Sequence, residues 1–270
     1  MKKEKIIFIV LIVLFSLLFI YSTFNIIKWF IDSSKTNKQI KEIQNNVTVN
    51  EVVDNENTEI IEGNEEVSKS NPYWDFIKLN MIDVDFSELM STNKDTIGWI
   101  QVNGTNVNYP FVQTKDNSYY LNHSYDYSKN ESGWVFLDYR NNINNLDKNT
   151  IIYAHGRNDR TMFGSLRFIL NNGWINNKNN FVIKISTEKE NSMWQIVSAY
   201  HIPVTSDYLI TNFTDNNDFM EFANMIIDRS MYDFDTKINE NDYLLTLSTC
   251  YNKTDRMVIH AKLIKKETKW

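Results

Sequence analysis

The strongest constraint on this chain is an apolar run near its start. No charged residue occurs from Ile6 to Ile27, and three lysines lie within the five residues before it. A helix that crosses a bilayer needs about 20 such residues, whereas the apolar core of a cleaved export signal has about 7 to 15. No small-residue cleavage site follows the run. The sequence therefore predicts a retained membrane anchor through residues 6–27, with a short cytoplasmic terminus and the rest of the chain extracellular.

A change in composition divides the remainder of the chain. Residues 32–70 are rich in Asn, Glu, Lys and Val, lack aromatic residues and show no sustained period. Such a segment cannot bury enough apolar surface to offset its ordering entropy, although residues 33–44 could be helical beside the membrane. We therefore expect a terminus and anchor over residues 1–31, a flexible extracellular linker over residues 32–70 and one globular domain over residues 71–270.

The pattern of the globular part favours a mostly β fold. About eight short strand-like runs are separated by turn residues, and no strand–helix–strand alternation appears. The clearest hairpin joins residues 98–102 to residues 106–112 through Asn103-Gly104, a pair that supplies the positive φ angles of a tight turn. Residues 214–231 instead carry apolar residues at helical spacing. We expect a closed, mostly antiparallel, eight-stranded β-barrel with N-terminal helices and a helix inserted before the last two strands.

Charge and residue counts exclude several classes of function. The net charge is −6 and no long basic block occurs, so the chain lacks the positively charged patch that is typical of a nucleic-acid-binding protein. A single cysteine cannot form an internal disulfide or a thiolate zinc cage. No two of the four histidines have the helical spacing of a zinc-enzyme motif. We expect no metal, no cofactor and no nucleic-acid partner.

The single cysteine ends a run that reads as a buried strand, Tyr243–Cys250. Turn residues follow, and Arg256 then begins a second apolar run that would form the partner strand of a hairpin. A lone cysteine is often only a small buried hydrophobe. A thiol at a strand end beside polar Ser248 and Thr249, with a guanidinium across a short turn, is instead placed where a thiolate would be stabilised. We therefore interpret Cys250 as a nucleophile, and Ser248 and Thr249 as candidate substrate contacts.

A nucleophilic thiol needs a partner that exchanges protons near neutral pH, which favours histidine. His155 ends a buried strand at a glycine-containing turn, as Cys250 ends another strand, so both could project at one rim of a barrel. His123, in an aromatic loop, is the competing candidate, and the residues alone leave the choice open. His201 and His260 lie within strands, where packing explains them.

Arg256 also has two interpretations. It could stabilise the negative charge that develops on a carbonyl oxygen under attack, an effect of roughly 3 to 4 kcal/mol. It could instead form a surface ion pair with Asp255 or Glu240, and such pairs contribute little.

These residues resemble a known family. Thr246–Cys250 followed by Arg256, together with a strand that ends in His155, is similar to the sortases, the cysteine transpeptidases of Gram-positive cell surfaces. Class B is the most similar, and the resemblance covers residues 72–263. Further class B stretches are Tyr119–His123, Phe136–Asn141, Thr150–His155 and Met162–Leu166.

The resemblance implies an eight-stranded sortase barrel and a Cys250–His155–Arg256 site, and it selects His155 over His123. It implies that Cys250 cleaves a C-terminal sorting motif of surface proteins and holds the product as a thioacyl enzyme. An amine of a peptidoglycan precursor then resolves this intermediate. By the same similarity Asn117, Leu121 and Ser248 would touch the sorting peptide.

The sequence departs from the class B pattern at two places. Ala154-His155-Gly156 replaces the common Gly-His-Asn, and the turn between Cys250 and Arg256 is short. Two other functions compete with transpeptidation. One is a cysteine peptidase that hydrolyses the same peptides, and the other is a non-catalytic tethered barrel that binds a surface ligand through residues 117–127.

Overall fold

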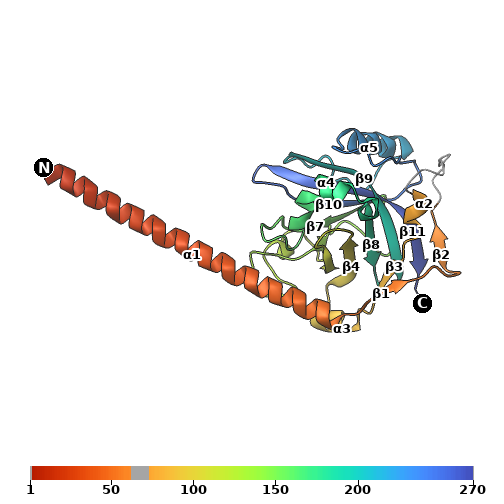
Figure 1. The fold of residues 1–270 in the computed structure, drawn as a ribbon, viewed down its shortest axis with the longest axis horizontal. Helices are drawn as coiled ribbons and strands as arrows, with labels where there is room; N and C mark the ends of the chain where they lie inside the picture. The colour runs from red at the N-terminus through yellow and green to blue at the C-terminus, as the bar shows by residue number, and fades with distance from the viewer. Residues whose placement is uncertain (1, 62–72, 270) are drawn as a thin grey trace.

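A single long helix leads into a β-barrel in this computed structural model, which describes residues 2–61 and 73–269. The helix α1 (Lys2–Asn46) projects far from the barrel at its N-terminal end and lies against it at its C-terminal end (Figure 1). Among the described residues it is the one helix long and apolar enough to cross a membrane. Its large apolar side chains up to Ile31 are exposed.

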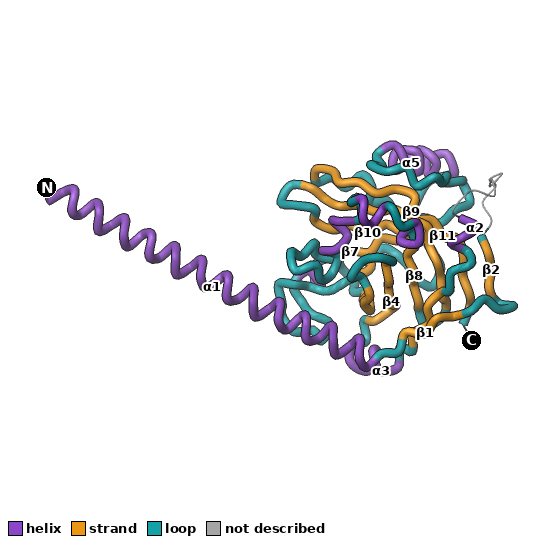
Figure 2. The backbone as a smooth tube through the Cα atoms, in the orientation of Figure 1, coloured by secondary structure: helices purple, strands orange, loops and turns teal. Residues whose placement is uncertain are grey.

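Eight strands close into the barrel, which confirms the predicted fold class. Their order around the barrel is β10-β7-β6-β5-β4-β8-β9-β11, and β11 pairs with β10 to complete the circle. The pairs β10–β7 and β5–β6 are parallel, and the other pairs are antiparallel. Figure 2 shows the strands of the barrel in orange. The strands are β4 (Thr96–Val102), β5 (Asn108–Val112), β6 (Phe136–Leu137), β7 (Asn149–Tyr153), β8 (Val182–Ser186), β9 (Glu190–Pro203), β10 (Leu244–Cys250) and β11 (Asp255–Thr268).

The predicted β4–β5 hairpin forms, but its turn is longer than a tight Asn-Gly turn. Gly104 alone in this turn has a positive φ, +69°. The turn closes through a hydrogen bond in which the Val102 N–H donates to the Val107 carbonyl at 3.0 Å. Asn103 keeps a negative φ, and its side-chain amide donates to the Asn179 carbonyl.

The helices are short apart from α1 and α5. The remaining α-helices and 3-10 helices are α2 (Tyr73–Phe76), α3 (Ser87–Thr92), η1 (Tyr119–Leu121), η2 (Gly164–Phe168), α4 (Asn172–Ile175) and η3 (Lys178–Asn180). Helix α5 (Asn216–Asp228) is the predicted insertion before the last two strands. Its start is capped by the Asp215 carboxylate, which accepts from the Asp218 backbone N–H.

Alternation along β10 and β11 creates two separate cores. Leu245, Leu247 and Ile259 point into the main core inside the barrel. Leu244 and Val258 lie on the other face and join a second core under α5. Successive strand residues point to opposite faces, so Ser248 and Cys250 share the outer face with Leu244.

The segment expected to be a flexible linker is ordered up to residue 61. Helix α1 continues to Asn46, β1 (Val49–Val52) pairs with β3 (Met81–Val84), and β2 (Thr58–Ile60) pairs with the end of β11. Ile40, Ile43 and Val47 are the few apolar residues of a polar stretch of α1, and all three pack against the domain. Residues 62–70 of the expected linker lie outside the described residues.

Candidate active site

Two neighbouring parallel strands bring Cys250 and His155 to one rim. In the β10–β7 ladder the last aligned pair is Ser248 with Tyr153. Cys250 and His155 each follow two residues later, so the same register places them side by side. Parallel strands end at the same edge of a sheet, which is why two residues distant in sequence meet here.

Close backbone packing fastens these two strand ends together. The Thr249 hydroxyl donates to the Ala154 carbonyl at 2.7 Å. A Cβ added at Gly156 would lie 2.0 Å from the Cys250 carbonyl oxygen, so only glycine fits beside that strand end. Cys250 and His155 are both half-buried, open to solvent on one side.

Arg256 lies directly across the β10–β11 ladder from Cys250. Directly opposed residues share a face, with Cβ atoms about 4.5 to 5.5 Å apart. Among the described residues the Arg256 guanidinium has no hydrogen-bond or ion-pair partner, and the pairs considered with Asp255 and Glu240 do not form. Asp255 instead accepts from Asn252 and Thr254. The guanidinium is therefore available for a ligand beside the thiol.

A carbonyl oxygen fixes the orientation of the His155 ring. Nε2 of His155 lies 2.7 Å from the carbonyl oxygen of Leu121. A carbonyl only accepts hydrogen bonds, so this contact assigns the proton to Nε2 and leaves Nδ1 as the basic nitrogen of the neutral ring. Gly133, with φ +59°, lies beneath the ring, where a Cβ would be 3.0 Å from Cδ2. The ring is thus held for proton transfer at Nδ1.

The other three histidines are engaged elsewhere. His123 stacks on Tyr119 with ring centroids 4.0 Å apart. His201 stacks on Tyr251 at 4.3 Å and lies in the strand row that points into the barrel, away from the Cys250 face. His260 is fully buried, and this burial lowers its pKa to about 3. His155 is the histidine that the fold places at the Cys250 strand end.

Comparison with known proteins agrees with this geometry. A family model described as the sortase domain matches residues 100–264. The chain is 36% identical over 186 residues to the sortase B of Listeria monocytogenes, covering 67% of this chain and 75% of that protein. The chain belongs to the sortase family.

The structural neighbours of this sortase are class B enzymes. A crystal structure of sortase B from B. anthracis in complex with AAEK1 superposes with a TM-score of 0.68 at 30% identity, covering 87% of this chain and 99% of that one. A Staphylococcus aureus sortase B–substrate complex gives 0.62 at 34% identity, covering 67% and 84%. The chain is therefore a class B, sortase-type cysteine transpeptidase.

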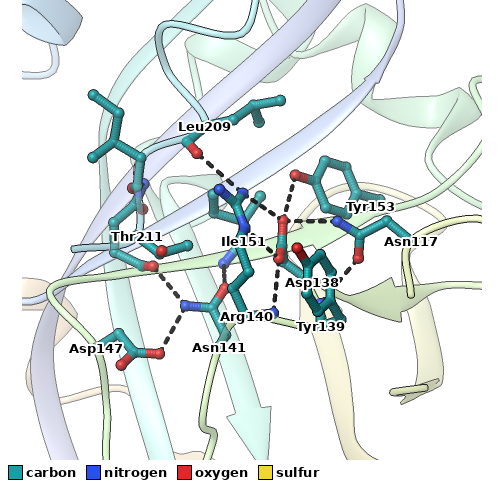
Figure 3. Close-up of polar contacts among 12 residues, drawn as sticks. Asn117, Asp138, Tyr139, Arg140, Asn141, Asp147, Ile151, Tyr153, Leu209 and Thr211 are labelled. Atoms are coloured by element: carbon teal, nitrogen blue, oxygen red, sulfur yellow. Dashed lines mark hydrogen bonds and ion pairs between the residues drawn. The ribbon is translucent and has the colours of Figure 1, made fainter. Parts of the chain in front are cut away.

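The buried carboxylate of Asp138 is the centre of a hydrogen-bond network beside the sortase site (Figure 3). Asp138 is fully buried and accepts hydrogen bonds from Arg140, Asn117 and Tyr153 at 2.8 to 3.0 Å. Burial alone would raise the pKa of Asp138, but the Arg140 and Tyr153 hydrogen bonds hold it below its usual range. Arg140 also donates to the Leu209 carbonyl at 3.1 Å. This network joins the Asn117 loop, the His155 strand and the segment before α5.

A tyrosine from that same segment covers the Cys250 strand. The hydroxyls of Tyr208 and Ser248 are 3.0 Å apart, and both side chains are buried. Burial raises the pKa of the Tyr208 phenol, opposed by the Ser248 hydrogen bond and by the positive charge of Arg256. The Arg256 charge thus acts on the phenol that bonds Ser248.

The sequence-predicted substrate contacts occupy different positions. Leu121 is exposed, and Ser248 is buried beneath Tyr208. The Asn117 amide donates to Asp138, and its oxygen accepts from the Tyr139 N–H at 2.9 Å. Thr249 is buried, and its hydroxyl donates to the Ala154 carbonyl, so it links the ends of two strands.

Sequence reasoning missed Asp138, Arg140 and Tyr208 as parts of the site. Asp138 and Arg140 follow an apolar strand and read as ordinary turn residues. Tyr208 lies in an irregular segment with no periodic signal. Only contacts between segments distant in the chain reveal their placement. In the part of the chain that the structure describes, no group of three or more His, Cys, Asp or Glu side chains could hold a metal ion.

Proposed function

We propose that this sortase is anchored in the membrane through residues 6–27 and attaches surface proteins to the cell wall. It would cleave a C-terminal sorting motif, hold the acyl part on Cys250 and transfer it to an amine of a peptidoglycan precursor. The observation that supports this proposal most directly is that the parallel strands β10 and β7 end at the same rim of the barrel, where Arg256 lies across the β10–β11 ladder from Cys250. The relatives support it, since one sortase B was solved with a substrate and another with triglycine.

In the first step Nδ1 of His155 takes the proton of the Cys250 thiol, and the resulting thiolate attacks the carbonyl carbon of the scissile peptide bond. The carbonyl oxygen becomes an oxyanion, which Arg256 stabilises because a guanidinium stays positively charged at any working pH. The C–N bond then breaks, and a proton from Nδ1 of protonated His155 goes to the leaving amine. The acyl group remains as a thioester on Cys250.

In the second step the acceptor amine attacks that thioester. Nδ1 of His155, now neutral, takes a proton from the attacking nitrogen. The C–S bond breaks, a new amide forms and the Cys250 thiolate is released. Water in place of the amine would give hydrolysis, so the alternative of a hydrolytic peptidase differs only in the acceptor.

The groove for the sorting peptide would lie on the outer face of β7 and β10. The Asp138 network forms one wall through Asn117, and Leu121 is exposed beside His155. The segment that carries Tyr208 forms the opposite wall over Ser248. We assign Asn117, Leu121 and Ser248 to peptide binding, with Asp138 as the residue that positions Asn117.

A peptide transfer assay tests this function. The full chain is incubated with a panel of fluorescence-quenched sorting peptides and an amine acceptor, and intact-mass spectrometry detects the acyl enzyme. We expect a thioacyl adduct that Cys250→Ala abolishes, with peptide cleavage reduced about 10⁴-fold or more. Failure of every peptide to form a Cys250-dependent adduct would contradict the proposal.

The ratio of products separates transfer from hydrolysis. Chromatography of the same reaction resolves the ligated peptide from the free acid. A rise in ligated product with acceptor concentration supports a transpeptidase. Free acid as the sole product at all acceptor concentrations would instead assign the chain to the hydrolytic alternative.

A further inference from the structure

The anchor helix of this protein makes direct contacts with the loops next to the active site. Helix α1 runs without a break from the apolar stretch to Asn46. Just beyond that stretch, Lys28 forms an ion pair with Glu131 at 3.0 Å. One and two turns later, Ser33 donates to Asp159 at 2.9 Å and Thr36 accepts from Asn130 at 3.1 Å. The helix therefore packs on the two loops that flank His155.

Arg157 is the centre of this contact. It follows His155 by two residues, and its side chain is almost fully buried. The guanidinium donates to Ser33 and to Asp159, and it lies 5.7 Å from the centre of the Trp29 ring. A buried guanidinium whose Nε and Nη2 groups are hydrogen-bonded holds its partners in a defined geometry. Arg157 thus links the His155 loop to the docked part of the helix.

Helix geometry places this unit close to the end of the apolar stretch. Ser33 follows Ile27 by six residues, which corresponds to a rise of about 9 Å along the helix. The headgroup layer outside the hydrocarbon core is about 5 to 8 Å thick on each side. Trp29 lies at the level where tryptophan is enriched in membrane proteins. The loop that carries His155 therefore lies at or just outside the headgroups of the proposed anchor's bilayer.

The end of the barrel that carries Cys250 and His155 faces the headgroup layer. Strand β11 pairs with β9 from Asp255↔Pro203 at one end to Thr268↔Glu190 at the other. Its 14 residues span up to about 45 Å, so the turn at residues 251–254 and the turn at residues 187–189 lie at opposite ends. Figure 1 shows the turn between β10 and β11 on the side from which α1 arrives, and the C-terminus on the far side.

We propose that the face around Cys250 and His155 is a membrane-facing surface whose partner is the lipid headgroup layer. The rigid, docked α1 sets this orientation, so the site opens toward the bilayer and not toward the wall. This inference rests on the membrane anchor of the proposed function. It adds that the anchor fixes the distance of the active site from the bilayer and the direction in which the site opens.

Lipid quenching at two positions tests the orientation. The full chain is placed in phosphatidylcholine vesicles that contain lipids with a nitroxide on the headgroup. A single fluorophore is attached through Lys253→Cys at the site end or Lys189→Cys at the far end, each with Cys250→Ala so that no second thiol reacts. We expect several-fold stronger quenching at position 253. Equal quenching, or stronger quenching at position 189, would overturn the proposal.

A flexible insertion tests the role of helix rigidity. Gly-Ser-Gly-Ser-Gly between Ile27 and Lys28 separates the apolar stretch from the docked part without removing any contact to the loops. We expect the quenching difference to disappear. The same five residues between Lys2 and Lys3 are the matched control and should preserve it. A difference that survives the first insertion would contradict orientation by α1.

Failure of the anchor is distinguishable from failure of the chemistry. Release of the chain from vesicles by alkaline carbonate would overturn the anchor and this inference together. Transfer of soluble peptides to a soluble amine in detergent does not depend on orientation. It therefore tests the proposed reaction independently of the quenching result.

Discussion

The two faces of strand β10 differ in composition and in function. Leu245 and Leu247 point into the barrel and are fully buried among apolar side chains. On the outer face the side chains toward the rim are polar and meet polar partners. Thr246 bonds His260 and Asn149, Ser248 bonds Tyr208, and Cys250 faces Arg256 across the ladder.

This difference separates stability from chemistry within one strand. The inner face gains from apolar burial, which depends on area and disfavours any polar group that lacks a hydrogen-bond partner. The outer face offers donors, acceptors and charges, and it becomes more open toward the strand end, from fully buried His260 to half-buried Cys250. Substitutions on the outer face near the rim should change the reaction, whereas those on the inner face should change the free energy of unfolding.

Arg256 on the outer face should give the largest effect. Arg256→Ala removes the charge beside the oxyanion, so we expect the rate of peptide cleavage to fall about 10² to 10³-fold. Arg256→Lys is the control, since it keeps the charge without the planar fork and should recover part of the rate. Steady-state kinetics decides the role: a lower kcat indicates oxyanion stabilisation, and a higher KM alone indicates peptide binding. An unchanged kcat/KM would contradict both.

Leu247 on the inner face should show the opposite behaviour. Leu247→Ala leaves a cavity in the barrel core, so we expect a loss of about 2 to 5 kcal/mol in the free energy of unfolding. Urea unfolding of the full chain in detergent measures it. The kcat of the molecules that remain folded should be unchanged. A large fall in kcat with little loss of stability would erase the distinction between the two faces.

His260 makes the outer face sensitive to acid. Burial lowers its pKa to about 3 from 6.5, so in this interval the unfolded chain binds a proton that the folded chain excludes. The free energy of unfolding should therefore fall with pH below about 6.5, by up to about 1.4 kcal/mol per pH unit. His260→Gln should reduce this slope between about pH 6 and pH 4.5. An identical slope in the variant would show that other groups cause the acid sensitivity.

The hydrogen bond between Tyr208 and Ser248 should have the smallest effect. Tyr208→Phe and Ser248→Ala should each cost about 1 kcal/mol in the free energy of unfolding. The double variant should cost less than their sum, because each single change already breaks the shared bond. Because Ser248 is assigned to peptide binding, Ser248→Ala should also raise KM, whereas Tyr208→Phe should not. Strict additivity would show that the two hydroxyls do not interact.

The sequence predicted those parts of the site that depend on neighbours in the chain. Cys250 and Arg256 are six residues apart across a turn, so strand alternation alone places them on one face. The inserted helix α5 was predicted from apolar spacing and the β4–β5 hairpin from its Asn-Gly pair, although the turn proved longer. The eight-stranded barrel was predicted from the number of strands and the sortase resemblance, and the closed pairing of β10 with β11 confirms it.

The tertiary structure decided everything that depends on pairing between distant segments. Residues alone left His155 and His123 as alternatives, because the parallel register between β7 and β10 is set by contacts across about 95 residues and has no local signal. The same holds for Asp138, whose partners come from Asn117 and Tyr153. It also holds for the end of α1, since its few apolar residues, Ile40, Ile43 and Val47, become buried only because the barrel offers them a surface. Local periodicity determines elements, whereas burial between elements determines which of them meet.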